Sequence, residues 1–471
     1  MSEPGHAHAL GPVNEGRLRS WSAAVLRRFR TCSRVSQLCG AAKHNQRISE
    51  FVNLLPKRRS TAEAAEGNSG RLVDGRAALQ ERKRRGGLSR TLQDGFAGGL
   101  LALFTLAVSA HASDWPMHRG GPQLQGRTDM PAPSKPDLAW TFSAGKPIKA
   151  GAAVAGGRVF VGDDDGIIHA VDFYTGKELW TFKTEASIEA TPLVLHDVVY
   201  EGSGDGNVYA LDAATGKLKW KYETGDKVMG GANYAKNPKG DGEWLLIGSY
   251  DTNLHCVDAA TGKVVWTHGT DNYINGSPAI FSSGEIVFGG CDSYIHVLQL
   301  SDGKELREIE SEAYIASSVA ILGDTGYVGN YGNLVIAFDP NGPKGNEIKW
   351  KYRDRNFPYF SSAALTEDRV VIGGRDKRLH CIERATGKGV WNFDTRGQVD
   401  SSPVICGDGI VVGCEDGRLY CVNLADGKER WEYEIGAPIT ASPAASNGLI
   451  IVGAEDGNLY AFGKPLKPAK P

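Results

Sequence analysis

A tryptophan that returns about every 40 residues is the feature that most constrains how this chain can fold. The repeat is clearest at residues 204–220, where an Asp-Gly turn, a short apolar strand, an Asp-x-x-Thr-Gly-Lys turn and a strand carrying Trp220 follow one another. At steps of 40 to 46 residues the position of Trp220 is held in turn by Trp140, Trp180, Trp220, Trp266, Arg307, Trp350, Trp391 and Trp431. Seven of the ten Trp residues fall there, so composition alone does not explain the pattern.

A period near 40 with four strand-like runs per unit predicts blades of a β-propeller, because one small sheet cannot bury its own faces. The first three strand types occur eight times, the last at 441–462, whereas the Trp strand starts one unit early, at Trp140. If the Trp140 strand completes the last blade, the ring closes and no sheet edge is left exposed. The sequence therefore predicts an all-β fold, an eight-bladed propeller closed by its N-terminal strand.

The repeat resembles that of the PQQ-like, or quinoprotein-type, propellers, whose signature is Ala-x-Asp-x-x-Thr-Gly-Lys-x-x-Trp. The match spans roughly 114–462; it is close around Trp180, Trp220, Trp266, Trp391 and Trp431 and looser in the fourth and fifth copies. The resemblance implies that each repeated Trp is wedged between neighbouring blades as a structural girdle. An aromatic surface for stacking a ligand is the alternative, but large aromatics at a repeated position usually serve packing.

Two subgroups of that family imply different functions. One binds pyrroloquinoline quinone and calcium in its central funnel and oxidises alcohols or sugars; the other, including the BamB-type scaffold of outer-membrane β-barrel assembly, keeps the fold without a cofactor. The enzymes depend on a vicinal Cys-Cys pair against the quinone, and no adjacent cysteines occur in this sequence. We therefore expect no cofactor and no catalytic residues, with a quinone- and calcium-dependent dehydrogenase as the alternative.

Charge divides the chain into unlike regions. Residues 1–90 carry 18 Lys and Arg against 7 Asp and Glu, a net +11, whereas the remainder carries 35 against 48, a net −13. A basic run at 82–85, an apolar core at 96–108 and Ala110-His111-Ala112 have the order of a secretory signal. We expect a disordered or spurious extension at 1–90 (a nucleic-acid arm is the alternative), a signal peptide at 91–112 within a chain that starts near Val73 or Leu88, and a mature protein starting near Ser113.

The rest of the chain divides into three predicted parts. Residues 113–136, which begin with Asp114-Trp115-Pro116, are expected to form a strap over one end of the ring. The propeller itself is expected at 137–463, and a disordered tail at 464–471. Insertions at 237–242 and 341–345 map to the face opposite the Asp-Gly turns.

The segment that enters each first strand should line the central channel. It pairs a uniformly apolar position with a variable one, which reads Lys149, Glu189, Met229, Asn275, Ala316, Phe360, Asp400 and Thr440. Because a purely structural position should look alike in eight copies, this variety indicates a neutral position or a site built from one residue per blade. Ligand sites favour such concave mouths. The candidate ligand-binding residues are Lys149, Glu189, Met229, Asn275, Phe360 and Asp400, with a Lys149–Glu189 ion pair as the structural alternative.

Acidic, histidine and cysteine residues of the repeat receive structural interpretations. The Asp of each Asp-Gly turn fits turn chemistry, although together these residues would form an acidic rim that attracts cations or basic peptides. Four histidines lie in different blades and are interpreted as strand-surface residues that cannot form a metal site: His169, His255, His296 and His380. The cysteines show no CxxC or metal-ligand spacing, so neither a disulfide framework nor a metal site is expected.

The function predicted from these observations is a periplasmic or secreted, non-catalytic interaction scaffold. Its partners would be envelope or secreted proteins, and not nucleic acid. The mature chain is expected to be a monomer with no transmembrane segment. A dehydrogenase and an extracellular sensor module are the alternatives.

Overall fold

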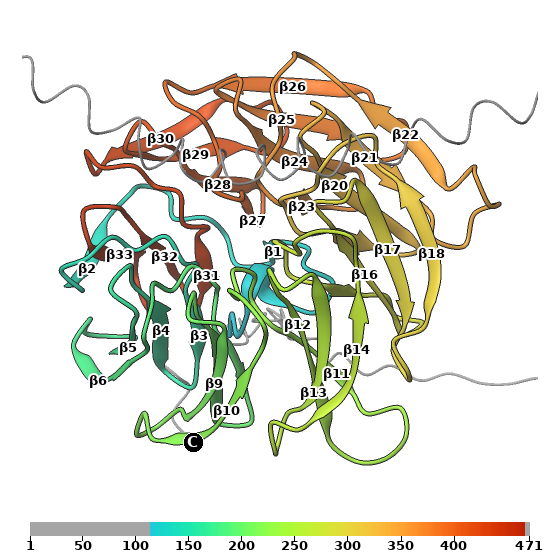
Figure 1. Ribbon diagram of the computed structural model, residues 1–471. Helices are drawn as coiled ribbons and strands as arrows, with labels where there is room; N and C mark the ends of the chain where they lie inside the picture. The colour runs from blue at the N-terminus through green and yellow to red at the C-terminus, as the bar shows by residue number, and fades with distance from the viewer. Residues whose placement is uncertain (1–113, 467–471) are drawn as a thin grey trace, which may run out of the picture. The chain divides into compact units, whose positions relative to one another are not determined.

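The computed structural model describes residues 114–466, and the predicted extension at 1–90, the signal peptide at 91–112 and the end of the tail lie outside them. The described chain forms eight small antiparallel sheets arranged as a ring (Figure 1). We number these sheets as blades 1 to 8 in the order in which their first strands occur. The predicted eight-bladed all-β propeller is confirmed.

Each blade is a meander whose first strand lies toward the channel and whose fourth lies at the outside. Blade 1 comprises β3 (Ala153–Ala155), β4 (Arg158–Gly162), β5 (Ile167–Asp172) and β6 (Glu178–Lys183). Blade 2 comprises β7 (Leu193–Leu195), β8 (Val198–Gly202), β9 (Asn207–Asp212) and β10 (Leu218–Glu223). Blades 3 and 4 comprise β11 (Asn233–Lys236), β12 (Glu243–Gly248), β13 (Asn253–Asp258), β14 (Val264–Gly269), and β15 (Ala279–Ile280), β16 (Glu285–Gly289), β17 (Tyr294–Gln299), β18 (Glu305–Glu310).

The second half of the ring repeats the same order. Blades 5 and 6 comprise β19 (Ala320–Leu322), β20 (Thr325–Gly329), β21 (Val335–Phe338), β22 (Ile348–Tyr352), and β23 (Ala364–Leu365), β24 (Arg369–Gly374), β25 (Arg378–Glu383), β26 (Gly389–Asp394). Blades 7 and 8 comprise β27 (Val404–Cys406), β28 (Gly409–Gly413), β29 (Arg418–Asn423), β30 (Glu429–Glu434), and β31 (Ala444–Ser446), β32 (Leu449–Gly453), β33 (Asn458–Gly463) with β2 (Leu138–Ser143) as the outer strand.

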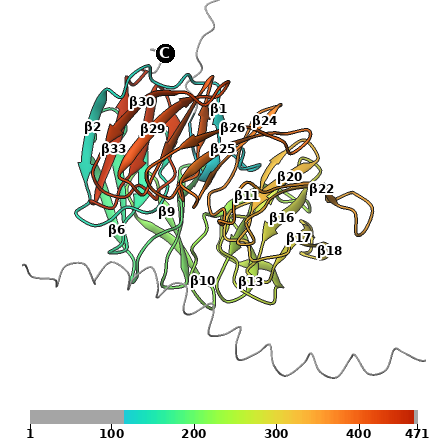
Figure 2. The same cartoon turned by 90° about the horizontal axis from the view of Figure 1, so that it is seen from above.

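Blade 8 is built from both ends of the described chain. Strand β2 pairs antiparallel with β33, with Trp140 opposite Ala461 and Phe142 opposite Leu459. In Figure 2 the two strands lie side by side although one is coloured as N-terminal and the other as C-terminal. This pairing, predicted from the offset of the Trp strand, gives blade 8 the four strands that the other blades have.

The burial pattern follows from the ring. The second and third strands of each blade, such as β4 and β5, are almost wholly buried, because both of their faces pack against neighbouring blades. The outer strands alternate between more exposed and half-buried residues, as in β6 and β10. The Asp-Gly turns that join second and third strands place glycine at positive φ, +83° at Gly166 and at Gly206, where a side chain would be strained.

The repeated tryptophans lie on the outer strands and reach across to the neighbouring part of the ring. Each indole N–H donates a hydrogen bond to a backbone carbonyl of the next blade, for example Trp180 to Ala213 and Trp266 to Leu300. The ring of Trp180 also covers Gly216, where a Cβ would approach the indole to 2.6 Å. Seven Trp make such bonds, the last of them to the strap: Trp140, Trp180, Trp220, Trp266, Trp350, Trp391 and Trp431.

The strap enters the ring and follows it round from the inside. Its backbone hydrogen-bonds successive inner strands in chain order, from Trp115 with Val154 through Pro116 with Val194 to Gly126 with Ile405. A 3-10 turn, η2 (His118–Gly120), lies inside the ring, and β1 (Arg127–Thr128) adds a parallel strand to β27 (Figure 1). The segment predicted as a strap over one end of the ring thus runs along the inner strands, within the channel. Within the described residues there is no helix long and apolar enough to cross a membrane.

Candidate functional site

The central channel contains a small cavity of about 150 Å³ between the strap and the segments that enter the first strands. Five of the eight variable positions line it: Glu189, Met229, Asn275, Ala316 and Phe360. These positions of blades 2 to 6 thus lie around one cavity, and ligand binding there stays a prediction. A cavity of this size holds about one benzene-sized molecule or a few ordered waters.

Lys149 and Asp400, the other two candidate residues, are engaged elsewhere at the mouth. Lys149 forms an ion pair with Asp164 of its own blade. The guanidinium of Arg375 donates to both carboxylate oxygens of Asp400, at 2.9 and 2.5 Å. It also lies 3.7 Å from the centre of the Phe360 ring. Lys149 and Asp400 thus each form an ion pair with a partner of opposite charge.

The partners at the mouth come from a second variable position that the sequence analysis did not single out. It precedes the Asp-Gly turn or its equivalent and reads Asp164, Gly204, Tyr250, Cys291, Tyr331, Arg375, Glu415 and Glu455. Tyr250 hydrogen-bonds Asn275, and Thr440 donates to Glu455. The variation of this second position from blade to blade is the signal in the sequence that could have identified it. The contact between the two positions is made only when the turns fold over the channel.

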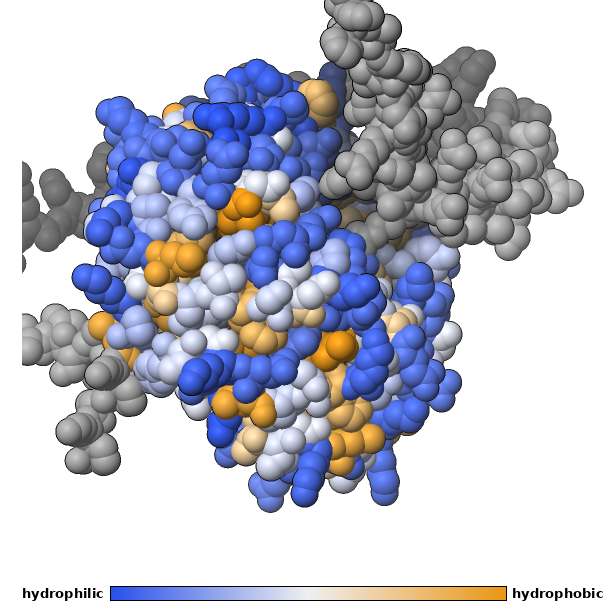
Figure 3. All heavy atoms as spheres, turned by 90° about the vertical axis from the view of Figure 1, so that its left-hand side faces the viewer, coloured by the Kyte–Doolittle hydropathy of each residue, from blue (hydrophilic) through white to orange (hydrophobic). Residues whose placement is uncertain are grey.

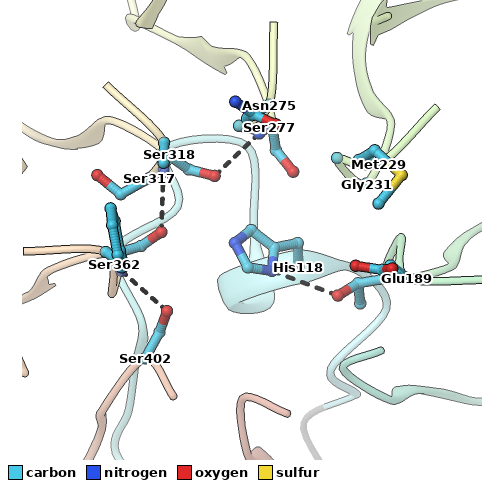
Figure 4. A pocket seen from close by; sticks show the side chains of 15 residues that line it. His118, Glu189, Met229, Gly231, Asn275, Ser277, Ser317, Ser318, Ser362 and Ser402 are labelled. Atoms are coloured by element: carbon cyan, nitrogen blue, oxygen red, sulfur yellow. Dashed lines mark hydrogen bonds between the residues drawn. The ribbon is translucent and has the colours of Figure 1, made fainter. Parts of the chain in front are cut away.

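One wall of the cavity is a row of serines, one from each successive blade. The backbone N–H of Ser277 donates to Ser318 Oγ at 2.9 Å, and the N–H of Ser318 donates to Ser362 Oγ at 3.0 Å. The row continues through Ser402 to Ser442, at 2.9 and 3.1 Å. Each hydroxyl thereby ties one blade to the previous one around the channel. Figure 4 shows this wall on one side of His118, with Glu189 and Met229 on the other.

The strap supplies the floor of the cavity. His118 Nδ1 lies 3.4 Å from Thr191 Oγ1, and burial together with the charge of Arg119 lowers the pKa of His118 to about 3, so the ring is neutral at pH 7. Arg119 is 2% exposed and donates to the backbone carbonyls of Ala363, Ser402 and Pro403 at 3.1, 3.2 and 2.6 Å. Burial lowers the pKa of Arg119 to about 9, so the guanidinium stays protonated at pH 7. The cavity is polar, with a fixed positive charge beneath it.

The Asp residues of the turns are mostly occupied by local hydrogen bonds. Asp205 accepts from the backbone N–H of Asn207 and of Glu185 and from the Tyr209 hydroxyl. Asp416 makes the equivalent bonds in blade 7. Turn chemistry therefore explains these carboxylates, as the sequence analysis favoured.

The interpretation of four histidines as strand-surface residues is wrong. All four are buried, each exposed by 5% or less, and the Nε2 of each donates to the carboxylate of its own turn Asp: His169, His255, His296 and His380. They replace Tyr209-type residues, whose hydroxyl makes the same bond. Their assignment to different sheets is correct, but a fifth histidine, His268, comes close to His296, with 6.2 Å between ring centroids.

The described cysteines are all buried: Cys256, Cys291, Cys381, Cys406, Cys414 and Cys421. Burial raises the pKa of Cys381, Cys414 and Cys421 to about 12. These thiols behave as small apolar groups.

Comparison with known proteins identifies the fold family. A sequence profile of the family described as outer membrane protein assembly factor BamB matches residues 134–273, 228–356 and 334–462. No curated protein sequence matches the chain.

Solved structures share the fold at low identity. BamB from Moraxella catarrhalis is 18% identical over 71% of this chain and 98% of its own, with a TM-score of 0.59. Quinohemoprotein alcohol dehydrogenase from Comamonas testosteroni is 15% identical over 76% and 82%, with a TM-score of 0.63. A computationally designed protein, Ika8, is 17% identical over 69% and 99%, with a TM-score of 0.61. Because the profile covers most of the chain and the predicted ring is present, this protein belongs to the BamB family of PQQ-like β-propellers.

Proposed function

We propose that this protein is a non-catalytic scaffold of the bacterial envelope that binds other proteins on a face of its ring, in the manner implied by the name of its family. The proposal places it in the periplasm or outside the cell, after removal of the segment that ends near Ala112. The observation that carries it is the occupied channel. The strap and the serine wall line a polar cavity of about 150 Å³, and charges are paired at the mouth, where a quinoprotein would need a cofactor funnel.

Pyrroloquinoline quinone is a poor match for these residues. Its fused three-ring system with three carboxylates is much larger than the single ring that a 150 Å³ cavity accommodates. Ligand pockets for cofactors usually have volumes of about 300 to 1,000 Å³. Calcium prefers several free carboxylate or carbonyl oxygens, whereas the mouth carboxylates Asp164 and Asp400 already bind Lys149 and Arg375. These contacts favour the scaffold over the dehydrogenase.

A loop on the mouth face offers a partner-binding feature. Six residues, 353–358, separate β22 from the apolar position Tyr359, whereas four, 395–398, separate β26 from Val399. The longer loop carries Phe357, 48% exposed, and the exposed residues Arg353 and Arg355. Aromatic and Arg residues are the side chains that most often dominate binding energy at interfaces.

The outer wall of the ring is less suited to a partner. The side shown in Figure 3 is largely hydrophilic, with apolar residues in separate spots. Its exposed apolar side chains, such as Leu179 and Leu218, stand singly on the outer strands β6 and β10. Isolated apolar residues of this kind are ordinary on protein surfaces.

Binding to the purified outer-membrane protein assembly machinery tests the proposal. Surface plasmon resonance with the full chain should detect binding, and Phe357→Asp should weaken it by about tenfold or more. Leu179→Asp, a matched change at an equally exposed apolar residue (47%) on the outer wall, should leave the affinity unchanged.

A parallel arm tests the alternative. Pyrroloquinoline quinone and calcium are added to the same preparation, followed by dye-linked alcohol oxidation. A bound chromophore with alcohol-dependent dye reduction, or no binding of the machinery by the wild-type chain, would overturn the scaffold proposal.

A further inference from the structure

A single histidine breaks an apolar pattern on the outer strands. The residue two places after the girdle position packs toward the next blade, and in seven blades it is aromatic or aliphatic: Phe142, Phe182, Tyr222, Ile309, Tyr352, Phe393 and Tyr433. In blade 3 it is His268, on β14. An imidazole at a site that otherwise takes a Phe or Tyr ring needs a polar counterpart in the neighbouring blade.

Blade 4, which follows blade 3 in the ring (Figure 1), supplies that counterpart from β17 and β18. Glu305 Oε1 lies 2.7 Å from His296 Nδ1 and 3.7 Å from His268 Nε2. The three potential ligand atoms lie within 4.8 Å of one another. Ligand atoms bound at about 2.0–2.2 Å to one zinc ion are roughly 3 to 4 Å apart, so small side-chain movements would bring these three onto one centre.

A buried carboxylate orients the central ligand. Asp292 Oδ2 lies 2.9 Å from His296 Nε2, and both side chains are only 3% exposed. If Nε2 carries the proton shared with Asp292, then Nδ1 presents its lone pair toward Glu305. Two acceptors 2.7 Å apart require a cation or a proton between them. A carboxylate behind a ligating histidine is the arrangement that fixes ring orientation in metal sites.

We propose that His268, His296 and Glu305 bind a divalent transition-metal ion of the Zn²⁺ class, with a fourth position open to water. The donor set of two imidazoles and one carboxylate suits zinc. The side chains of His268 and Glu305 are 17% and 28% exposed, so an ion can enter from solvent. The ion ties β14 of blade 3 to blade 4. Blade 4 is also the blade whose own girdle position holds Arg307 instead of Trp.

Two similar clusters in the same ring lack one element of the site. In blade 1, His169 contacts Glu178 at 2.9 Å and Asp163 at 3.2 Å, but the neighbouring outer strand contributes Phe142 instead of a histidine. In blade 6, Asp354 and Asp376 flank His380, but Arg378 already binds Asp354 at 3.1 Å. Among the described residues, only the blade 4 cluster combines two histidines with a carboxylate that has no Arg or Lys bridge in the structure.

Titration of the tag-free, chelator-treated full chain with Zn²⁺ in a calorimeter tests the site. One ion should bind per chain, and Co²⁺ should give the visible spectrum of a nitrogen- and oxygen-ligated ion. His268→Phe, which restores the aromatic residue of the other blades, should weaken Zn²⁺ binding at least 100-fold. Asp292→Asn should weaken it about 10- to 100-fold. His169→Tyr, which removes the histidine of the blade 1 cluster, should leave the affinity as it is.

Three results would overturn the proposal. The wild-type chain could fail to bind Zn²⁺, or His268→Phe could bind it as tightly as the wild type while keeping the wild-type circular dichroism spectrum. A thiolate-to-cobalt charge-transfer band would place the ion on cysteines instead. None of these results bears on partner binding, so the test is independent of the scaffold proposal.

Discussion

The indole N–H of Trp180 in blade 1 donates a 3.1 Å hydrogen bond to the backbone carbonyl oxygen of Ala213 in blade 2. The same ring covers Gly216 of the turn that follows, at φ +69°. One residue therefore joins two sheets by a polar and an apolar contact, and the ring repeats this join five more times, whereas Trp431 bonds the strap. The tryptophan repeat is a mechanism of closure as well as a sequence marker.

Trp180→Ala should lower the free energy of unfolding by about 3 kcal/mol, because it removes a large packed side chain and one hydrogen bond. Urea unfolding followed by circular dichroism measures the loss. Arg307→Ala, at the equivalent position in blade 4, is the matched control and should cost less than about 1 kcal/mol. Equal losses at the two positions would show that the girdle does not depend on the indole.

Glu201→Val should stabilise the protein. Glu201 is fully buried on β8, and neither of its carboxylate oxygens has a hydrogen-bond partner in the structure. Seven other blades place an apolar residue at the equivalent position: Val161, Ile247, Phe288, Val328, Ile372, Val412 and Val452. The gain should be about 1 to 3 kcal/mol at pH 7, since the unpaired group loses its hydration on folding.

The protonation of Glu201 determines how the effect of Glu201→Val on stability changes with pH. Burial raises its pKa well above the ordinary value of 4.5, so above pH 4.5 the folded chain holds a proton that the unfolded chain releases. Stability must then fall as pH rises from 4.5 toward the folded pKa. The difference in unfolding free energy between Glu201→Val and the wild type should grow over that range. A difference independent of pH would contradict the buried, protonated state.

His169→Tyr should remove a pH-dependent contribution to stability that comes from hydrogen bonds and not, as at Glu201, from burial. Burial disfavours the charged ring, but hydrogen bonds with Asp163 and Glu178 outweigh it and raise the pKa of His169 above 6.5. The protonated ring therefore stabilises the fold below pH 6.5, and this contribution is lost as pH rises through the folded pKa. Tyrosine already occupies the position in blades 2 and 7, where it bonds the turn Asp. Between pH 5.5 and 8 the melting temperature of the variant should change less with pH than that of the wild type.

Arg119→Met should loosen the strap. The substitution keeps an unbranched side chain but withdraws the donors from the carbonyls of Ala363, Ser402 and Pro403, at about 1 to 3 kcal/mol for buried acceptors left unsatisfied. Limited trypsin digestion should then cut after Arg127 faster than in the wild type. Lys135→Met, at an exposed position of the same segment, should not change that rate. A strap that remained resistant in Arg119→Met would mean that its backbone bonds to the inner strands suffice.

The architecture could be predicted because the order of strand types within each repeat indicates which strands pair. Trp140, one unit ahead of its blade, predicted the pairing with Ala461 that the structure contains. Sequence reasoning also placed Glu189, Met229, Asn275 and Phe360 around one channel. It failed for the four buried histidines, because a strand position does not reveal that its turn Asp folds back onto it. It also missed His268, since a residue three strands away from His296 in chain order gives no local signal.

The sequence alone determined the number of blades, the closing strand and the tryptophan girdle, because each depends on local turns and strands repeated at a fixed period. Only the tertiary structure decided what faces the channel and what meets between blades. Hydrogen bonds to inner strands up to 280 residues away in the sequence fix the path of the strap. Lys149 and Asp400 form ion pairs with turn residues instead of lining the cavity. Such contacts depend on how eight separate sheets pack in space, and no periodicity along the chain encodes them.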